Sequence, residues 1–157
     1  MRTLILTLAA LLAGGAANAQ PMTVASHSLS QSGATRVLQA AEQTAARLSA
    51  PSAIAVVNAD GLLLAFIRMD DVRPAGGDLA IGKARTAALL QRPTAELEEN
   101  VAKGRVGLAT VGLTALRGGA PLVIDGAYVG AVGVAGRVKE QDAQIAQEVA
   151  AQFGAAK

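Results

Sequence analysis

The segment IGKARTAALLQRPT carries two side chains that are well suited to binding chemistry, Lys83 and Thr86. Residues three apart in a helix share a face, so this ammonium group and this hydroxyl can act on one guest. A carboxylate is the expected guest, because hydrogen bonds that involve a charged group are strong. The segment is equally consistent with a helix that faces solvent. A small anionic ligand, such as an organic acid or a propionate group, is therefore one of two interpretations.

A second candidate is the glycine pair Gly118 and Gly119, which lies shortly before Pro121. Glycine leaves the backbone accessible and proline stiffens the chain that follows, so main-chain N–H groups here could contact an anion. The alternative is a plain connection into a strand.

The glycines that follow, Gly130, Gly133 and Gly136, have a different meaning. A dinucleotide fingerprint places its glycines between a strand and a helix of a βαβ unit. The first two fall within a predicted strand that follows a hairpin turn, and the third comes directly after it. We therefore expect them to allow close packing against a neighbouring element rather than to cradle a phosphate.

Metal chemistry depends on His27, the only histidine in a chain without cysteine. A closed zinc site within one subunit lacks its usual ligands. One axial ligand to haem iron is still available from His27, Met22, Met69 or Tyr128. A hydrolytic triad would also need His27 as its base, and no segment resembles a nucleophile elbow.

Residues 1–19 have the three parts of a secretory signal. Arg2 supplies the charge, residues 4–12 the apolar run, and Ala17-Asn18-Ala19 the cleavage site. We expect cleavage after Ala19, and hence a location outside the cytoplasm, either periplasmic or secreted. The apolar run is too short to span a bilayer, so no membrane span is expected in the mature chain.

The composition of the whole chain limits the kinds of partner that are expected. The 14 basic and 12 acidic side chains nearly balance, which does not favour nucleic acid as a partner. Aromatic residues are few, namely Phe66, Tyr128 and Phe153. A core of small side chains buries little area per residue, so association into a homo-oligomer is expected.

Periodicity predicts one domain over residues 30–157, after a polar leader at residues 20–29. The first helix spans residues 30–49 and is capped by Ser30 or Ser32. Two hairpins follow from the turn signals Asp60-Gly61 and Asp125-Gly126.

The expected strands are 53–58, 62–68, 106–116, 121–124 and 128–135. The later helices are 78–91, capped by Asp78, a short one from Thr94, and 140–153. This order predicts an α+β fold, a two-layer sandwich with a mainly antiparallel five-stranded sheet and flanking helices.

Three segments together resemble the GlcG/HbpS family, which also supplies the C-terminal domain of PduO proteins. They are SAIAVVNADGLLLAFIRMDD, DLAIGKARTAALLQRPTAEL and GGAPLVIDGAYVGAVGVAGRVKEQDAQIA. The resemblance covers residues 30–150. It implies the family's α/β sandwich, haem binding, assembly into higher oligomers and, for exported members, haem or redox sensing with a partner sensor protein.

On this basis we expect an exported, oligomeric haem-binding protein without assigned catalytic residues. The expected ligand contacts are Arg68, Met69, Lys83, Thr86, Gly118 and Gly119, with His27 as the axial metal ligand. Two alternatives stay open: a periplasmic accessory module that works through protein contacts without a cofactor, and a binder or enzyme of a small organic acid.

Overall fold

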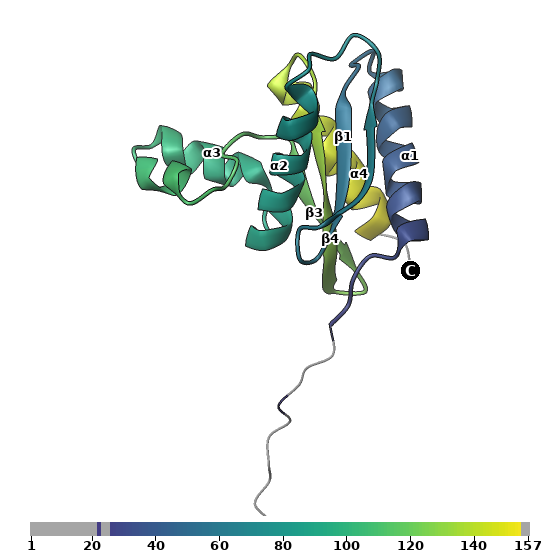
Figure 1. Cartoon of the computed structure of the whole chain (residues 1–157), viewed down its shortest axis with the longest axis horizontal. Helices are drawn as coiled ribbons and strands as arrows, with labels where there is room; N and C mark the ends of the chain where they lie inside the picture. Colours follow the sequence, from purple (N-terminus) through teal and green to yellow (C-terminus); the bar gives the residue numbers. More distant parts are fainter. Residues whose placement is uncertain (1–21, 23–25, 155–157) are drawn as a thin grey trace, which may run out of the picture.

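A four-stranded antiparallel sheet forms the centre of the protein (Figure 1). The computed structural model describes residue 22 and residues 26–154. The strands are β1 (Ala53–Asn58), β2 (Leu63–Arg68), β3 (Gly119–Ile124) and β4 (Ala127–Ala135), and they lie in the order β2-β1-β4-β3. The α+β class and the antiparallel sheet are thus confirmed, whereas the predicted fifth strand is wrong.

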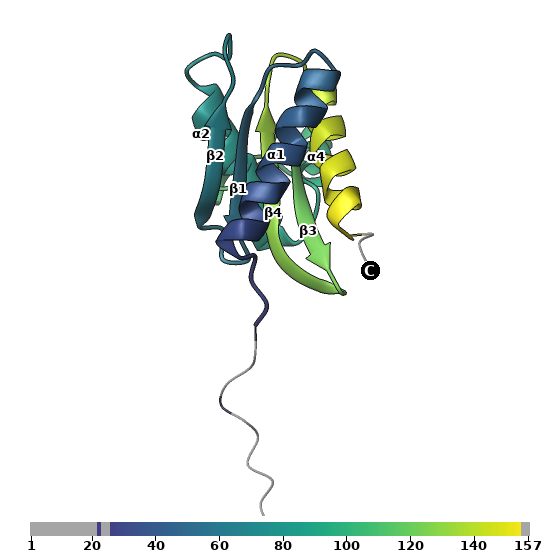
Figure 2. The same ribbon diagram turned by 90° about the vertical axis from the view of Figure 1, so that its right-hand side faces the viewer.

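Helices cover both faces of the sheet, so the fold has three layers rather than the expected two. Helices α1 (Gln31–Arg47) and α4 (Lys139–Gly154) lie side by side on one face, and α2 (Gly76–Leu90) covers the other (Figures 1 and 2). The alternation along β1 explains this arrangement, because successive strand residues point to opposite faces. Ile54 and Val56 belong to the core beneath α1 and α4. Ala53, Ala55 and Val57 belong to the core beneath α2.

The core beneath α2 consists almost entirely of alanine, which lets the helix approach the sheet closely. The closest approach is at Gly133. A Cβ atom there would lie 2.2 Å from the carbonyl oxygen of Ala80 and 2.4 Å from the nitrogen of Ala84. Helix backbone therefore occupies the space that a side chain would need, which confirms the packing role predicted for this glycine.

Local sequence signals explain where most elements begin and end. The Ser30 side chain accepts a hydrogen bond from the Gly33 N–H at 3.1 Å, which caps α1 as expected. Asp125 and Gly126 both have positive φ, as a tight turn between β3 and β4 requires. Leu29, the last residue of the predicted leader, is 9% exposed and donates its N–H to Val129 O.

The expected strand at residues 106–116 does not form. Its first half is instead a 3₁₀ helix, η1 (Val106–Thr110), which with α3 (Thr94–Ala102) extends away from the sheet (Figure 1). Gly112 has a φ of +73°, a conformation outside the strand region. Val106 and Val111 are 66% and 61% exposed, so the segment has no buried face of the kind that a strand needs.

Helix α2 also begins earlier than expected. Its first residue is Gly76 and its N-cap position is held by Ala75, which makes no side-chain capping bond. Asp78 is therefore not the cap; it lies in the first turn. A carboxylate is favourable there too, because the helix dipole is positive at this end.

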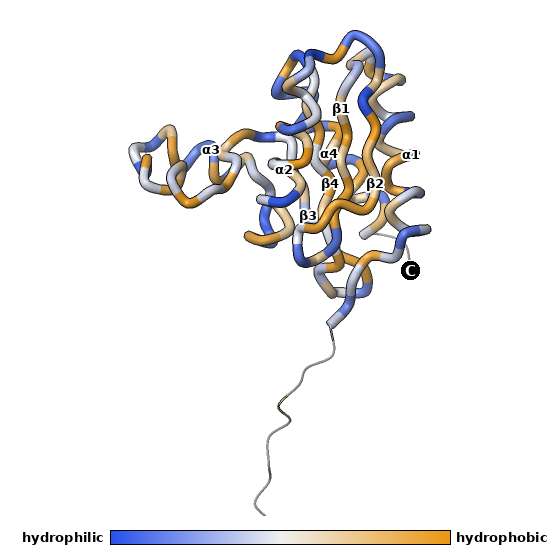
Figure 3. Tube along the Cα trace, in the orientation of Figure 1, coloured by the Kyte–Doolittle hydropathy of each residue, from blue (hydrophilic) through white to orange (hydrophobic). Residues whose placement is uncertain are grey.

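Apolar residues concentrate along the strands (Figure 3). Among the described residues, no helix is both long and apolar enough to cross a bilayer. The predicted signal peptide, residues 1–19, lies outside the described residues.

We predict that Gly133→Ala lowers the free energy of unfolding by about 1–3 kcal/mol, the usual cost of overpacking. The added methyl group collides with α2 backbone, which cannot rotate away as a side chain could. Gly107→Ala is the matched control, since nothing lies within 4 Å of its added Cβ. Urea denaturation measures both; equal stabilities for the two variants would contradict this view of the α2 interface.

Candidate functional site

A buried ion pair lies at the end of the sheet where β4 finishes. Lys83 Nζ is 2.9 Å from Asp142 Oδ2, and the two side chains are only 4% and 6% exposed. The same ammonium group donates to the carbonyl oxygen of Val134 at 2.8 Å. Lys83 faces the sheet because it follows the buried Ala80 and precedes the buried Ala87 at helical spacing.

This ion pair joins elements from opposite faces of the sheet. Lys83 belongs to α2 and Asp142 to the first turn of α4. The second carboxylate oxygen of Asp142 accepts the N–H of Gly136 at 2.7 Å, just beyond β4. The pair therefore fixes both helices to the end of β4.

Gly118 lies directly against this pair, and only glycine fits there. Its φ is +114°, and an added Cβ would be 2.6 Å from Val134 O and 3.0 Å from Lys83 Nζ. The predicted proximity of Lys83 to the glycine pair is therefore present in the structure.

Outside the ion pair is a cavity of about 150 Å³, which we call the basic pocket. Its charged lining has five cationic side chains: Arg73, Lys83, Arg117, Arg137 and Lys139. Two carboxylates, Glu98 and Asp142, also line it. The cavity wall thus carries three more positive charges than negative ones.

Glu98 is shared between two of these cations. Arg117 Nε donates to Glu98 Oε2, and Lys139 Nζ lies 3.6 Å from Oε1. Burial alone would raise the pKa of Glu98, but the hydrogen bond from Arg117 and the charges of Arg117 and Lys139 outweigh it, so this pKa is lowered. The same pairing raises the pKa of Arg117. Glu98 is therefore ionised at neutral pH, and each of its carboxylate oxygens is paired with one of these cations.

The remaining polar groups predicted for this site are used within the protein. The Gly119 N–H donates to Thr94 Oγ1 at 2.9 Å. The hydroxyl oxygen of Thr86 accepts the N–H of Thr114 at 2.8 Å. The first bond joins the start of β3 to the start of α3, and the second holds the chain at Thr114 against α2. Of the predicted polar set, Lys83 is the one that lines the basic pocket.

Arg68 and Met69 do not converge with Lys83, contrary to our expectation. They lie at the end of β2, on the opposite edge of the sheet from β3. The cavity beside them measures about 480 Å³, and three of its lining residues are acidic: Glu42, Asp70 and Asp71. These carboxylates make this cavity electrostatically unsuitable for an anion.

The interactions of Arg68 and Met69 are local. Arg68 Nη1 donates to the carbonyl oxygen of Val72 at 3.2 Å. The sulfur of Met69 accepts the backbone N–H of Ser52 at 3.4 Å. Both contacts stabilise the chain where it leaves β2.

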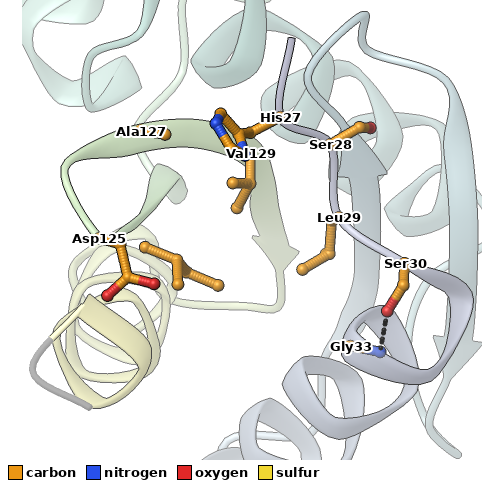
Figure 4. Close-up of a pocket in the computed structure, with 9 residues that line it drawn as sticks. His27, Ser28, Leu29, Ser30, Gly33, Asp125, Ala127 and Val129 are labelled. Carbon is orange, nitrogen blue, oxygen red and sulfur yellow. Dashed lines mark hydrogen bonds between the residues drawn. The ribbon is translucent and has the colours of Figure 1, made fainter. Parts of the chain in front are cut away.

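His27 lines a third cavity, of about 330 Å³, which we call the His27 pocket (Figure 4). Its walls come from the segment before α1, from the β3–β4 turn and from β4. The aliphatic side chains of Leu29, Ile124 and Val129 contribute to it, with Asp125 at the turn. An imidazole beside an apolar wall is a donor set that fits a haem group.

The His27 pocket and the basic pocket lie at opposite ends of β4. Val129 lines the first and Ala135 the second. Six residue-to-residue steps along the strand, at about 3.3 Å each, separate these two residues by roughly 20 Å. Within one subunit, His27 and Lys83 therefore belong to separate sites. Among the described residues, no group of three or more His, Cys, Asp or Glu side chains could hold a metal ion.

Sequence reasoning missed most of the basic pocket, including Arg73, Arg117, Arg137 and Asp142. Asp142 was detectable, because it extends the buried stripe of Ile145 and Val149 by one step towards the start of α4. The arginines come from three connections, and no periodic pattern links them.

We predict that Lys83→Met destabilises the protein by about 3–5 kcal/mol, because it leaves the Asp142 carboxylate buried without its cation. Asp142→Asn keeps an oxygen for the Gly136 N–H but removes the charge. The double variant should therefore lose less stability than the two single variants together, by about 1–3 kcal/mol. Urea denaturation of all four proteins measures this coupling; strictly additive losses would show that the two groups do not interact.

Comparison with known proteins places this fold and these residues in a family. A family model described as "Haem degrading protein HbpS-like" matches residues 29–151. Protein GlcG of Escherichia coli strain K12 is 44% identical over 107 residues, which cover 68% of this chain and 80% of GlcG. The corrinoid adenosyltransferase PduO of Salmonella typhimurium is 32% identical over 135 residues, which cover 81% of this chain and 38% of PduO.

Solved structures share the fold. The HbpS crystal structure superimposes with a TM-score of 0.77 at 32% identity, covering 85% of this chain and 95% of HbpS. A structure described as a PduOC:heme complex gives 0.70 at 30% identity, covering 79% of this chain and 94% of that one. Protein ORFY of Klebsiella pneumoniae gives 0.81 at 26% identity, covering 88% and 99%. The chain therefore belongs to the GlcG/HbpS family.

Proposed function

We propose that this chain is an exported, homo-oligomeric haem-binding protein that senses or handles haem. The description of the matching family and the haem complex of a structural neighbour support the choice of ligand. The signal-like residues 1–19 support export. A sensor or another periplasmic protein is the proposed partner.

The His27 pocket is the observation that carries this proposal. Haem sites combine an axial ligand with apolar walls. His27 is the chain's only histidine, and it lines the His27 pocket together with Leu29 and Val129. A volume of about 330 Å³ is at the lower end for ligand pockets, so one subunit would cover only part of a haem.

A second copy of the chain is the proposed cover for the rest of the haem. The protein has a core of small residues and leaves large apolar side chains in solvent, including Leu62 at 64% and Val106 at 66% exposed. Exposed apolar groups of this kind gain most from association with another apolar surface. Oligomer formation and haem binding would then support each other.

The proposed activity is binding, and we assign no catalytic residue. Asp125 supplies the carboxylate on the described wall of the His27 pocket. Asp125 lies in the β3–β4 turn, where its backbone geometry already explains its presence.

We predict that hemin added to the protein gives a saturable Soret change that His27→Ala weakens. Loss of the axial imidazole should reduce haem affinity by at least about tenfold, equivalent to about 1.4 kcal/mol. The matched control is Ser28→Ala, a neighbouring substitution at the same pocket that removes no iron ligand. Absorption titrations of the three proteins measure the effect.

The absence of any saturable Soret change would contradict the proposal and favour an accessory module that works through protein contacts. Equal affinities of the parent protein and His27→Ala would place the haem elsewhere. Export has a separate test. The N-terminal residue of protein recovered from the periplasm should be Gln20.

A further inference from the structure

The basic pocket has more positive charge than its own carboxylates can neutralise. Asp142 is committed to Lys83, and Glu98 is shared by Arg117 and Lys139. Neither Arg73 nor Arg137 forms a salt bridge with any carboxylate in the described part of the chain. Two guanidinium groups thus line one cavity without a partner of opposite charge.

Cations on the inner wall retain donors as well. The Lys83 ammonium group has three N–H donors and gives two of them to Val134 O and Asp142 Oδ2. Lys83 is only 3% exposed and lines the cavity, so its buried positive charge contributes to the potential there. Arg117 uses its Nε for Glu98, which leaves its four terminal N–H groups. The floor and the rim of the cavity therefore both present donors and positive charge.

The size of the cavity limits the guest. A volume of about 150 Å³ is small beside the roughly 300–1,000 Å³ of ordinary ligand pockets. A nucleotide or a peptide chain would extend well beyond it. A molecule of two to four carbon atoms with acidic groups is of the right size.

Chemistry then distinguishes among small anions. A guanidinium group recognises a carboxylate through two parallel hydrogen bonds. The pocket has two unpaired guanidinium groups, and the aliphatic side chains of Leu79 and Leu116 also line it. Two carboxylates joined by a short carbon chain match this combination, since the leucines would contact the methylene groups.

We propose that the basic pocket binds a small dicarboxylate. Arg73 and Arg137 bind its two carboxylates at the rim, and Lys83 and Arg117 donate from the floor. The start of α4 beside the pocket adds to the positive potential, because Lys139 is the first residue of that helix. This site is separate from the proposed haem site, which lies at the other end of β4.

Calorimetric titration with succinate at low ionic strength tests the proposal. We expect saturable binding of one succinate per subunit, with much weaker binding of acetate and of inorganic phosphate. Arg73→Gln and Arg137→Gln should each reduce succinate affinity by about tenfold, because each removes a charge-assisted pair at the exposed rim. Both residues are exposed, so neither substitution should unfold the protein.

Arg85→Gln is the matched control, since this exposed arginine of α2 lies outside the lining of the basic pocket. It should keep the parent affinity. His27→Ala should also keep it, so that failure of the haem proposal is distinguishable from failure of this one. No succinate binding, binding unchanged by Arg73→Gln and Arg137→Gln, or stronger binding of phosphate than of succinate would each overturn the dicarboxylate assignment.

Discussion

The ion pair between Lys83 and Asp142 is the interaction on which the rest of the structure depends. It is almost fully buried, and it connects α2 and α4 around the end of a sheet that separates them. A buried ion pair need not add stability, because desolvation offsets much of its attraction. The pair instead specifies how the helices are placed. The buried ammonium group of Lys83 meets a carboxylate only when α2 and α4 lie as they do here. That arrangement also fixes the floor of the basic pocket.

Small residues make this arrangement possible. Alanine and glycine between α2 and the sheet bring the helix backbone close enough for Lys83 to reach the carbonyl oxygen of Val134. Gly118 leaves the space that the ammonium group occupies. Because these side chains are small, each subunit buries little apolar area, which supports the proposed oligomer. Close packing and the proposed association would thus have the same cause in the composition.

Local patterns were sufficient to predict most of the secondary structure. The helix stripe before Leu48, the two turn signals and the apolar strand runs all act over a few residues, and the structure follows them. The segment at residues 106–116 was predicted wrongly because its apolar content matches a strand while its glycines and its exposure do not. The third layer depends on which face each helix covers, and the separation of Arg68 from Lys83 depends on the order of the strands in the sheet. A single sequence encodes neither choice locally.

NMR observation of the lysine side-chain ammonium groups tests the central interaction most directly. The chain has a suitable internal reference in Lys103, whose side chain is 75% exposed. The account predicts that Lys83 gives an ammonium signal whose protons exchange slowly with water, and that Asp142→Asn abolishes this protection. Exchange at Lys83 as rapid as at Lys103 would show that the ammonium group is not held in the interior, and would contradict the account.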